Sequence, residues 1–475
     1  MFNGSENYDD DFFKPLEVVG ATALNGTTWF DRTNYFENVP TPALERTLWL
    51  ESDRMGHLLG AVTQEKLDNQ IGVVQNEKRQ RDNAPYGMVE YRQLEGLFPV
   101  GHPYRHSTIG SMEDLSAASL DDVKNWFREY YGASNTVVVL AGDIDAETAK
   151  PLMEKYFGDI EAGPALKAHK SWVPSRINNT IEEMVDEKAP QVRISRIRAV
   201  APRTNADADI LPLTARILGR GKNSRLYQAL VYKNQLAVSV SVSMQPFELA
   251  SMLEIEVTLK KGADEAKVHS LINDVMDDYL ANGPTAEELK RAKTSIVASS
   301  LRGIEAIGGF GGKGTALARS ELYTGNPNAY AESLKRLNYA SAAQVVEAAT
   351  TWLSQGYYQL TVRPKEKYTT TASSIDRSKG MPEVGTMPDL SFPAIEEAVL
   401  ANGLKVVVAN RPTVPVVTMA MQFDAGYAAD AGRPLGTASF ALGMMDEGTA
   451  RVLRLIFQQR RNALARVFLQ ALTLI

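Results

Sequence analysis

Apolar residues recur every three or four positions through much of the first third of the chain, which is the spacing of an amphipathic helix. This spacing predicts helices over residues 9–20, 41–55, 64–81, 115–130 and 145–157. Thr41-Pro42 supplies a helix start, while Gly20 and Asn83-Ala84-Pro85 supply stops. The β-branched run from Thr136 to Asp143 ends at a turn and predicts a core strand.

A second set of helix and strand signals extends from about residue 190 to residue 362. Residues 161–188, which contain prolines and lysines, are predicted to connect the two sets. Because strands and helices mix without strict alternation, we expect an α+β fold. The predicted strands lie at 236–243 and 252–259, and the predicted helices at 207–218, around 226–231, at 264–282 and at 285–302.

The last quarter of the chain begins with a stretch rich in Lys, Thr, Ser, Pro and Gly at 364–392, which predicts a linker. Residues 398–408 then predict two strands joined by an Asn-Gly turn. The tail at 450–475 holds five arginines and no Asp or Glu. It is interpreted as a non-native end or, alternatively, as a basic amphipathic helix for a membrane surface or a partner.

Composition narrows the function classes. A length of 475 residues suggests roughly three domains. The net charge of −6 does not support a nucleic-acid partner. The chain has no cysteine, which excludes disulfides, thiol nucleophiles and cysteine-type zinc sites. It also contains no apolar run long enough to span a membrane and no signal peptide at its start.

Glu77 is the first candidate for chemistry. It lies four residues after Val73 and three after Val74, so helical geometry places it beside an apolar stripe. A carboxylate that faces a core needs a partner, a metal or a proton. The alternative, which spacing alone does not exclude, is an ordinary solvated glutamate.

The histidines and one glycine-rich stretch are further candidate sites. His102 and His106 have i,i+4 spacing, but a proline and turn signals between them favour loop packing or hydrogen bonding over a zinc site. Neither HExxH nor HxxEH occurs in the chain. The stretch 308–314 lacks the spacing and the Ser or Thr of a phosphate loop, which favours a hinge or a substrate-contacting loop.

Several motifs resemble the pitrilysin/insulinase family of inverted-zincin metallopeptidases, and the resemblance covers roughly residues 1–449. The motifs are in the family's order, and their combination is specific although no single one is. They are Asn25–Trp29 with Thr33-Asn34-Tyr35, Val73–Arg79, His102-Pro103-Tyr104 with Ser107–Gly110, Tyr130-Tyr131 with Asn135, Ala141-Gly142-Asp143, and Gly221–Leu230.

The resemblance implies tandem homologous two-layer domains, each an antiparallel sheet flanked by helices. The family binds Zn²⁺ through HxxEH and a distant glutamate, which Glu77 matches. Met1–Ser5 resembles the residues directly after HxxEH in the family, so the chain is expected to begin inside a domain, without its first 50 or so residues. The expected divisions are 1–165, a second domain at 166–365, a linker at 366–392, the start of a third, zinc-less domain at 393–449, and the tail.

An internal repeat supports this interpretation. Met445–Thr449 repeats the Met-x-x-Gly-[Ser/Thr] skeleton of Met1–Ser5. Aligning the two places Ser439, Leu442 and Gly443 in the positions of the family's metal-binding motif. The first and third repeats are therefore expected to be incomplete, and the third to lack ligands.

The resemblance also implies function. The chain is expected to be a fragment of a zinc metalloendopeptidase that hydrolyses peptides or unfolded proteins, inactive by itself and without Zn²⁺, since Glu77 is its only remaining ligand and no catalytic residue is assigned. An edge strand with Asn25, Gly26, Thr27 and Thr28 is expected to pair with extended peptides. An ordinary edge strand is the alternative.

Two other functions stay open: a non-catalytic peptide-binding subunit that assists a catalytic partner, and an unrelated ligand-binding α+β protein. A catalytic or second-half partner subunit is a possible partner, whereas no nucleic acid and no membrane span are expected. The full-length parent is expected to be periplasmic or secreted.

Overall fold

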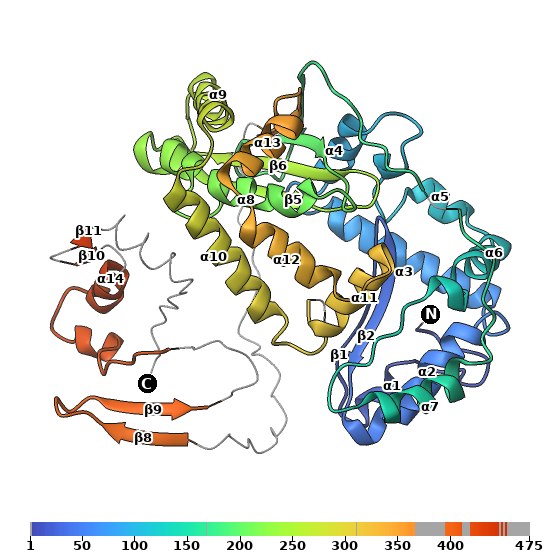
Figure 1. Ribbon diagram of the computed structural model, residues 1–475. Helices are drawn as coiled ribbons and strands as arrows, with labels where there is room; N and C mark the ends of the chain where they lie inside the picture. The colour runs from blue at the N-terminus through green and yellow to red at the C-terminus, as the bar shows by residue number, and fades with distance from the viewer. Residues whose placement is uncertain are drawn as a thin grey trace, which may run out of the picture.

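The computed structural model describes residues 2–167, 169–309, 311–365, 395–410, 419–445, 448–449 and 452–453. Figure 1 shows a β-hairpin and a group of helices from the start of the chain beside a larger sheet that carries its own helices. Strands and helices are mixed without regular alternation, which confirms the predicted α+β class. None of the helices in the described residues is long and apolar enough to cross a membrane.

The elements before residue 165 are mostly helical. The helices predicted at 64–81 and 145–157 are confirmed, with Thr63 and Asp145 as their N-caps. The elements are α1 (Lys14–Glu17), β1 (Thr22–Trp29), β2 (Arg32–Asn38), η1 (Thr41–Ala43), α2 (Leu44–Gly56), α3 (Gln64–Asp82), α4 (Val89–Leu97), η2 (Pro103–Arg105), α5 (Met112–Ala117), α6 (Leu120–Tyr130), η3 (Ala133–Asn135) and α7 (Ala146–Phe157).

Two helix predictions in this part were wrong in extent. The helix expected over 9–20 is only α1, because Asp10 and Asp11 accept hydrogen bonds from nearby backbone N–H groups and hold a turn instead. The helix expected over 115–130 is split into α5 and α6. Ser119 and Asp122 form a capping box that starts a new helix there.

The core strand predicted at 136–143 is not formed. These residues have no strand assignment, and Val138 is 42% exposed. A strand needs a neighbour to satisfy its backbone hydrogen bonds, and no strand of the described residues lies beside this segment. High β-propensity in the sequence was therefore insufficient to form a strand at 136–143.

The second part of the chain is built on a five-stranded sheet with the order β3-β7-β4-β6-β5. Strands β3 and β7 are parallel, and the other neighbours are antiparallel. The elements are β3 (Thr180–Asp186), β4 (Arg193–Val200), α8 (Asp207–Gly219), the π-helix η4 (Tyr227–Lys233), β5 (Ala237–Gln245), β6 (Ser251–Leu259), α9 (Glu265–Asn282), α10 (Ala286–Gly303), α11 (Lys313–Thr324), α12 (Ala329–Tyr339), α13 (Ala342–Leu353) and β7 (Tyr358–Pro364).

The sheet confirms most of the second set of predictions and corrects two of them. Strands β5 and β6 and helices α8, α9 and α10 lie where they were predicted. The connector expected over 161–188 contains β3, an edge strand. Its burial alternates, but the apolar Ile181 and Val185 lie at exposed positions, so apolar spacing did not reveal the strand. The helix expected around 226–231 is a π-helix.

Helices cover both faces of this sheet. Alternate residues of β6, from Leu253 to Leu259, enter a core with α8, α9 and α13. The other face packs against α4, whose Leu94 and Leu97 share a core with Tyr358 of β7. Helix α4 comes from the first part of the chain, so the two parts share this core.

The C-terminal segment contains the predicted hairpin, as β8 (Ile395–Val399) and β9 (Lys405–Ala409). It continues with η5 (Tyr427–Asp430), α14 (Thr437–Met444), β10 (Gly448–Thr449) and β11 (Val452–Leu453). The predicted linker at 366–392 and nearly all of the 450–475 tail lie outside the described residues. The division of the chain into domains stays a prediction.

Candidate functional site

The β1–β2 hairpin offers a free strand edge. In the described residues this sheet has only two strands, so β1 has no strand on the side away from β2. The strands pair antiparallel around a turn of two residues, Phe30 and Asp31, and the closing pair is Trp29 with Arg32. Such an edge presents unpaired backbone N–H and C=O groups.

The register identifies which residues of β1 face the free edge. In an antiparallel ladder, pairs that exchange hydrogen bonds alternate with pairs that do not, and the pair that closes a two-residue turn is bonded. Asn25, Thr27 and Trp29 therefore bond to β2. The backbone groups of Gly26 and Thr28 point outward, where an added strand would pair. An added strand would have to displace the Asn25 side chain, which accepts from the Gly26 N–H.

Local contacts hold the four predicted residues, among them a hydrogen bond of 3.0 Å between the hydroxyls of Thr28 and Thr33. The N–H of Gly26 donates to Oδ1 of Asn25 at 2.8 Å. A Cβ on Gly26 would lie 2.8 Å from Cζ of Phe2, so only glycine fits this packed position. Thr27 Oγ1 accepts from Nη1 of Arg32 at 2.7 Å.

The turn of the hairpin is fixed to the second part of the chain. The Phe30 ring lies 4.9 Å from the Phe247 ring and 5.1 Å from the Tyr104 ring. Oδ2 of Asp31 accepts from the N–H of Glu248 at 2.9 Å. These contacts join segments that are far apart in sequence and fix one end of β1.

Three arginines from separate segments gather near this turn: Arg32 of the hairpin, Arg203 after β4, and Arg319 of α11. Burial and the nearby charges of Arg32 and Arg203 lower the pKa of Arg319. The Arg203 guanidinium lies 4.6 Å from the centre of the Tyr323 ring, and its buried Nε has no hydrogen-bond partner in the described residues. The cluster could bind an acidic side chain or the carboxylate end of a peptide.

Sequence reasoning missed this cluster. No spacing rule connects positions 32, 203 and 319. The only local signal was the i,i+4 relation of Arg319 and Tyr323 on α11, which places both on one helix face.

Glu37, on β2, carries a carboxyl group with a raised pKa. Burial, together with the neighbouring Glu51, raises the pKa of Glu37 to about 8, and the Arg54 charge opposes the shift only in part. Arg54 is itself paired with Glu51 and lies 4.0 Å from the Tyr35 ring centre. Glu37 is therefore harder to ionise than a free glutamate, and its side chain is partly buried.

Glu77 lies on α3 in an exposed position. Its side chain is 61% exposed, and Oε1 is 3.7 Å from Nη2 of Arg81. Val73 is also exposed, so the expected apolar stripe does not face a core at this point. The solvated alternative describes this carboxylate.

The two closely spaced histidines serve local structure. His102 is buried, and its Nδ1 accepts from the N–H of Tyr104 at 3.0 Å. Nε2 must then carry the proton that is donated to the carbonyl of Trp172 at 2.8 Å. Nδ1 of His106 lies 3.2 Å from the carbonyl of Ser107. These are the loop contacts that were favoured over a zinc site.

Comparison with known proteins relates the chain to one peptidase family. The description Peptidase M16 inactive domain matches residues 117–296. The zinc protease PqqE of Helicobacter pylori is 28% identical over 236 residues, which are 48% of this chain and 51% of PqqE. An uncharacterized zinc protease of Mycobacterium leprae is 26% identical over 353 residues, covering 73% of this chain and 76% of that protein. These matches support the assignment of the chain to the M16, or pitrilysin, family of peptidases.

Solved structures share the fold of this chain. A protease from Helicobacter pylori has a TM-score of 0.68 at 22% identity, covering 76% of this chain and 87% of its own. The periplasmic protease PqqL from Escherichia coli has a TM-score of 0.61 at 14% identity, and the match covers 97% of this chain and 56% of PqqL. Pitrilysin has a TM-score of 0.60 at 18% identity, and the match covers 78% of this chain and 40% of pitrilysin. In sequence, the chain spans about half the length of PqqE.

The donor atoms in the described part of the chain do not fit a catalytic zinc ion. Such a site uses three protein ligands from His, Cys, Asp or Glu. The described residues contain no group of three such side chains close enough to hold a metal. Glu77 has Arg81 as its neighbour, and a cation beside a carboxylate opposes metal binding.

The glycine-rich stretch 308–314 lies against the hairpin. A Cβ on Gly308 would sit 1.8 Å from Oδ1 of Asn38, so this loop touches the end of β2. Gly309 has a φ of +77°, which favours glycine. The loop leads into α11 and so helps to place Arg319 over the hairpin.

Proposed function

We propose that this chain binds extended peptides by strand addition along β1, as part of a zinc metalloendopeptidase that hydrolyses peptides or unfolded proteins. The observation that carries the proposal is the free edge of β1, on which the backbone groups of Gly26 and Thr28 point outward. The flanking Asn25 and Thr27 hold the strand to β2. The relatives named as zinc proteases support the reaction class.

A proline at position 28 tests the mode of binding. Thr28→Pro removes an outward N–H but no backbone hydrogen bond of the hairpin, because the backbone of position 28 does not bond to β2. The hydroxyl bond from Thr28 to Thr33 is lost here and in the alanine control alike. We expect affinity for fluorescein-labelled casein, an unfolded protein, to fall at least about tenfold, which corresponds to the loss of one to two hydrogen bonds. Fluorescence anisotropy measures the change.

Thr28→Ala is the matched control, because it keeps the backbone N–H and removes the same exposed hydroxyl. Its affinity should stay within about twofold of the parent chain. Equal weakening by both variants would assign binding to the side chain and contradict strand addition. No weakening by Thr28→Pro would place the peptide elsewhere.

We further propose that this chain alone holds no catalytic zinc and does not hydrolyse peptides. Calorimetric titration of the chelator-treated chain with ZnCl₂ should show no stoichiometric sub-micromolar binding, since a useful site needs three ligands. A family member that contains HxxEH is the positive control. Tight binding that disappears in Glu77→Gln would overturn this expectation.

A non-catalytic peptide-binding subunit is the second candidate. The exposed, ion-paired Glu77 and the match to an inactive-domain description favour it. In that case the chain would assist a catalytic partner subunit. Raised peptide hydrolysis when the chain is mixed with an HxxEH-containing family member, abolished by Thr28→Pro, would distinguish it. PqqL is named as periplasmic, which supports a periplasmic or secreted location for this chain as well.

A further inference from the structure

A cavity in the second part of the chain lies outside the peptide edge. It has a volume of about 120 Å³ and lies between α8, the loop after this helix, and α10. Its polar lining comes from Arg216, Arg220, Asn223, Ser224, Arg291 and Ser295. This space holds several water molecules or one tetrahedral oxyanion.

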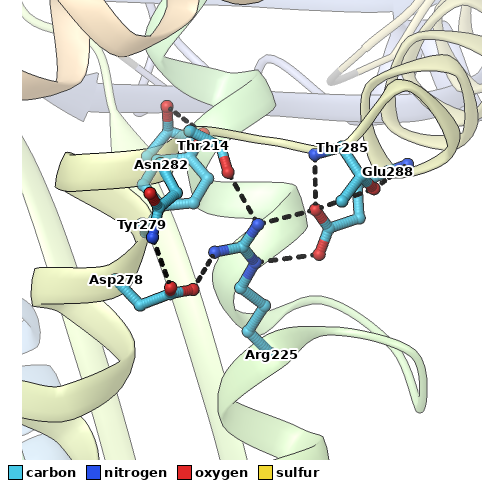
Figure 2. A network of polar contacts seen from close by, with 8 residues as sticks. Thr214, Arg225, Asp278, Tyr279, Asn282, Thr285 and Glu288 are labelled. Carbon is cyan, nitrogen blue, oxygen red and sulfur yellow. Dashed lines mark hydrogen bonds and ion pairs between the residues drawn. The ribbon is translucent and has the colours of Figure 1, made fainter.

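The cavity has three positive charges and no free negative charge in its lining. Glu288 also reaches the wall, but both of its oxygens accept from Arg225, each at 2.8 Å. Figure 2 shows Glu288 held by Arg225 on one side and by the N–H of Thr285 on the other. Among the described residues, no carboxylate lies within salt-bridge distance of Arg220 or Arg291, although Glu288 and Glu287 act on Arg291 electrostatically from further away.

Burial and repulsion both act on these arginines. Burial lowers the pKa of Arg216, and the neighbouring charge of Arg220 lowers it further. Burial also lowers the pKa of Arg291, although Glu288 partly compensates. An anion in the cavity would remove this repulsion, because each guanidinium group donates well to oxyanions.

The loop adds a donor that lacks an acceptor. Nδ2 of Asn223 is buried and has no hydrogen-bond partner among the described residues. Buried polar groups in native proteins are nearly always paired, so an unpaired amide indicates a missing acceptor. The loop is held in shape by Ser224, whose Oγ donates to the carbonyl of Gly221 at 2.7 Å, and Gly221 itself has a φ of +90°.

We propose that this cavity binds a phosphate group, with Arg216, Arg220 and Arg291 as its cationic ligands and Asn223 as a neutral donor. The group is either free phosphate or a phosphate monoester of a small molecule. The site is independent of the peptide edge, and peptide binding is not needed for it. It points to regulation or recognition by a phosphorylated small molecule.

Calorimetric titration of the intact chain with sodium phosphate, at fixed ionic strength in chloride, tests the proposal. We expect saturable one-to-one binding with a Kd below about 1 mM. Arg291→Gln should weaken it at least about tenfold. Lys290→Gln removes an equal charge from the exposed adjacent position of α10 and should leave the Kd unchanged.

Asn223→Asp provides a second test that does not depend on losing an arginine. It places a carboxylate of the same shape among the three guanidinium groups. We expect a higher melting temperature and no phosphate binding. Glycerol phosphate as a second titrant distinguishes a monoester from free phosphate by which of the two binds more tightly.

Two results would overturn the proposal. One is the absence of binding by the parent chain at 5 mM of either titrant, about five times the expected upper limit of Kd. The other is equal weakening by Arg291→Gln and Lys290→Gln, which would show only a general charge effect.

Discussion

Arg225→Ala is expected to lower the free energy of unfolding by about 3–5 kcal/mol, because it leaves a buried carboxylate without its cation. Arg225 donates to both oxygens of Glu288 and, through Nη1, to Asp278 at 2.8 Å. A further bond reaches the carbonyl of Gly283 at 2.7 Å. Figure 2 shows the guanidinium group enclosed by these acceptors. Urea unfolding measures the loss.

The acid dependence of stability supplies a second readout. Burial opposes ionisation of Glu288, yet the hydrogen bonds from Arg225 and Thr285 hold its pKa below the ordinary value of 4.5. The pKa of Glu288 is thus lower in the folded chain than in the unfolded chain. The stabilisation is complete above the unfolded pKa and is lost as the pH falls through the folded pKa. Arg225→Ala should remove this part of the acid sensitivity.

Arg363 is the matched control. It also donates to two carboxylates, those of Glu183 and Glu265, but its side chain is 34% exposed against 16% for Arg225. Solvent screens the ion pairs of the more exposed Arg363, so Arg363→Ala should lower the free energy of unfolding by about 1 kcal/mol or less. Equal losses for the two variants would contradict the importance of burial around Glu288.

Gly96→Ala is expected to destabilise the chain by about 3 kcal/mol through overpacking. A Cβ at this position would lie 2.1 Å from Cε2 of Tyr358 and 2.2 Å from its Cζ. Tyr358 is fully buried, and its hydroxyl donates to Glu182 at 2.9 Å, so the ring has little freedom to move. Helix α4 would have to shift away from the sheet.

Gly72→Ala is the same substitution at a position where the added Cβ contacts no neighbouring atom. Gly72 lies inside α3, and a Cβ there would meet nothing within 4 Å. Alanine favours the helix over glycine, so this variant should gain up to about 1 kcal/mol. Thermal unfolding of both variants gives the comparison. A Gly96→Ala chain as stable as its parent would show that α4 does not pack on β7.

Local signals predicted the elements whose ends are fixed by their own neighbours. Thr285 and Glu288 form a capping box at the start of α10, close to the predicted boundary. Alternation predicted β6, because its apolar residues all face one core. The segment at 136–143 has equally strong β-propensity but no neighbouring strand among the described residues, and it stays irregular.

The candidate sites also differ in whether a local sequence pattern could locate them. Asn25–Thr28 was located from sequence through family motifs, and the structure adds which backbone groups face outward. The arginines at 32, 203 and 319, and the cavity between α8 and α10, had no local pattern. Each depends on segments brought together by packing.

The sequence by itself determined the α+β class, most helix and strand positions, and the family to which the motifs belong. Those features depend on contacts between residues a few positions apart, where spacing and capping act directly. Only the tertiary structure decided that α4 covers the second sheet, that Glu77 faces solvent, and that Arg225 neutralises Glu288. Contacts between distant segments arise from the packing of many side chains at once, and no short stretch of sequence contains that information.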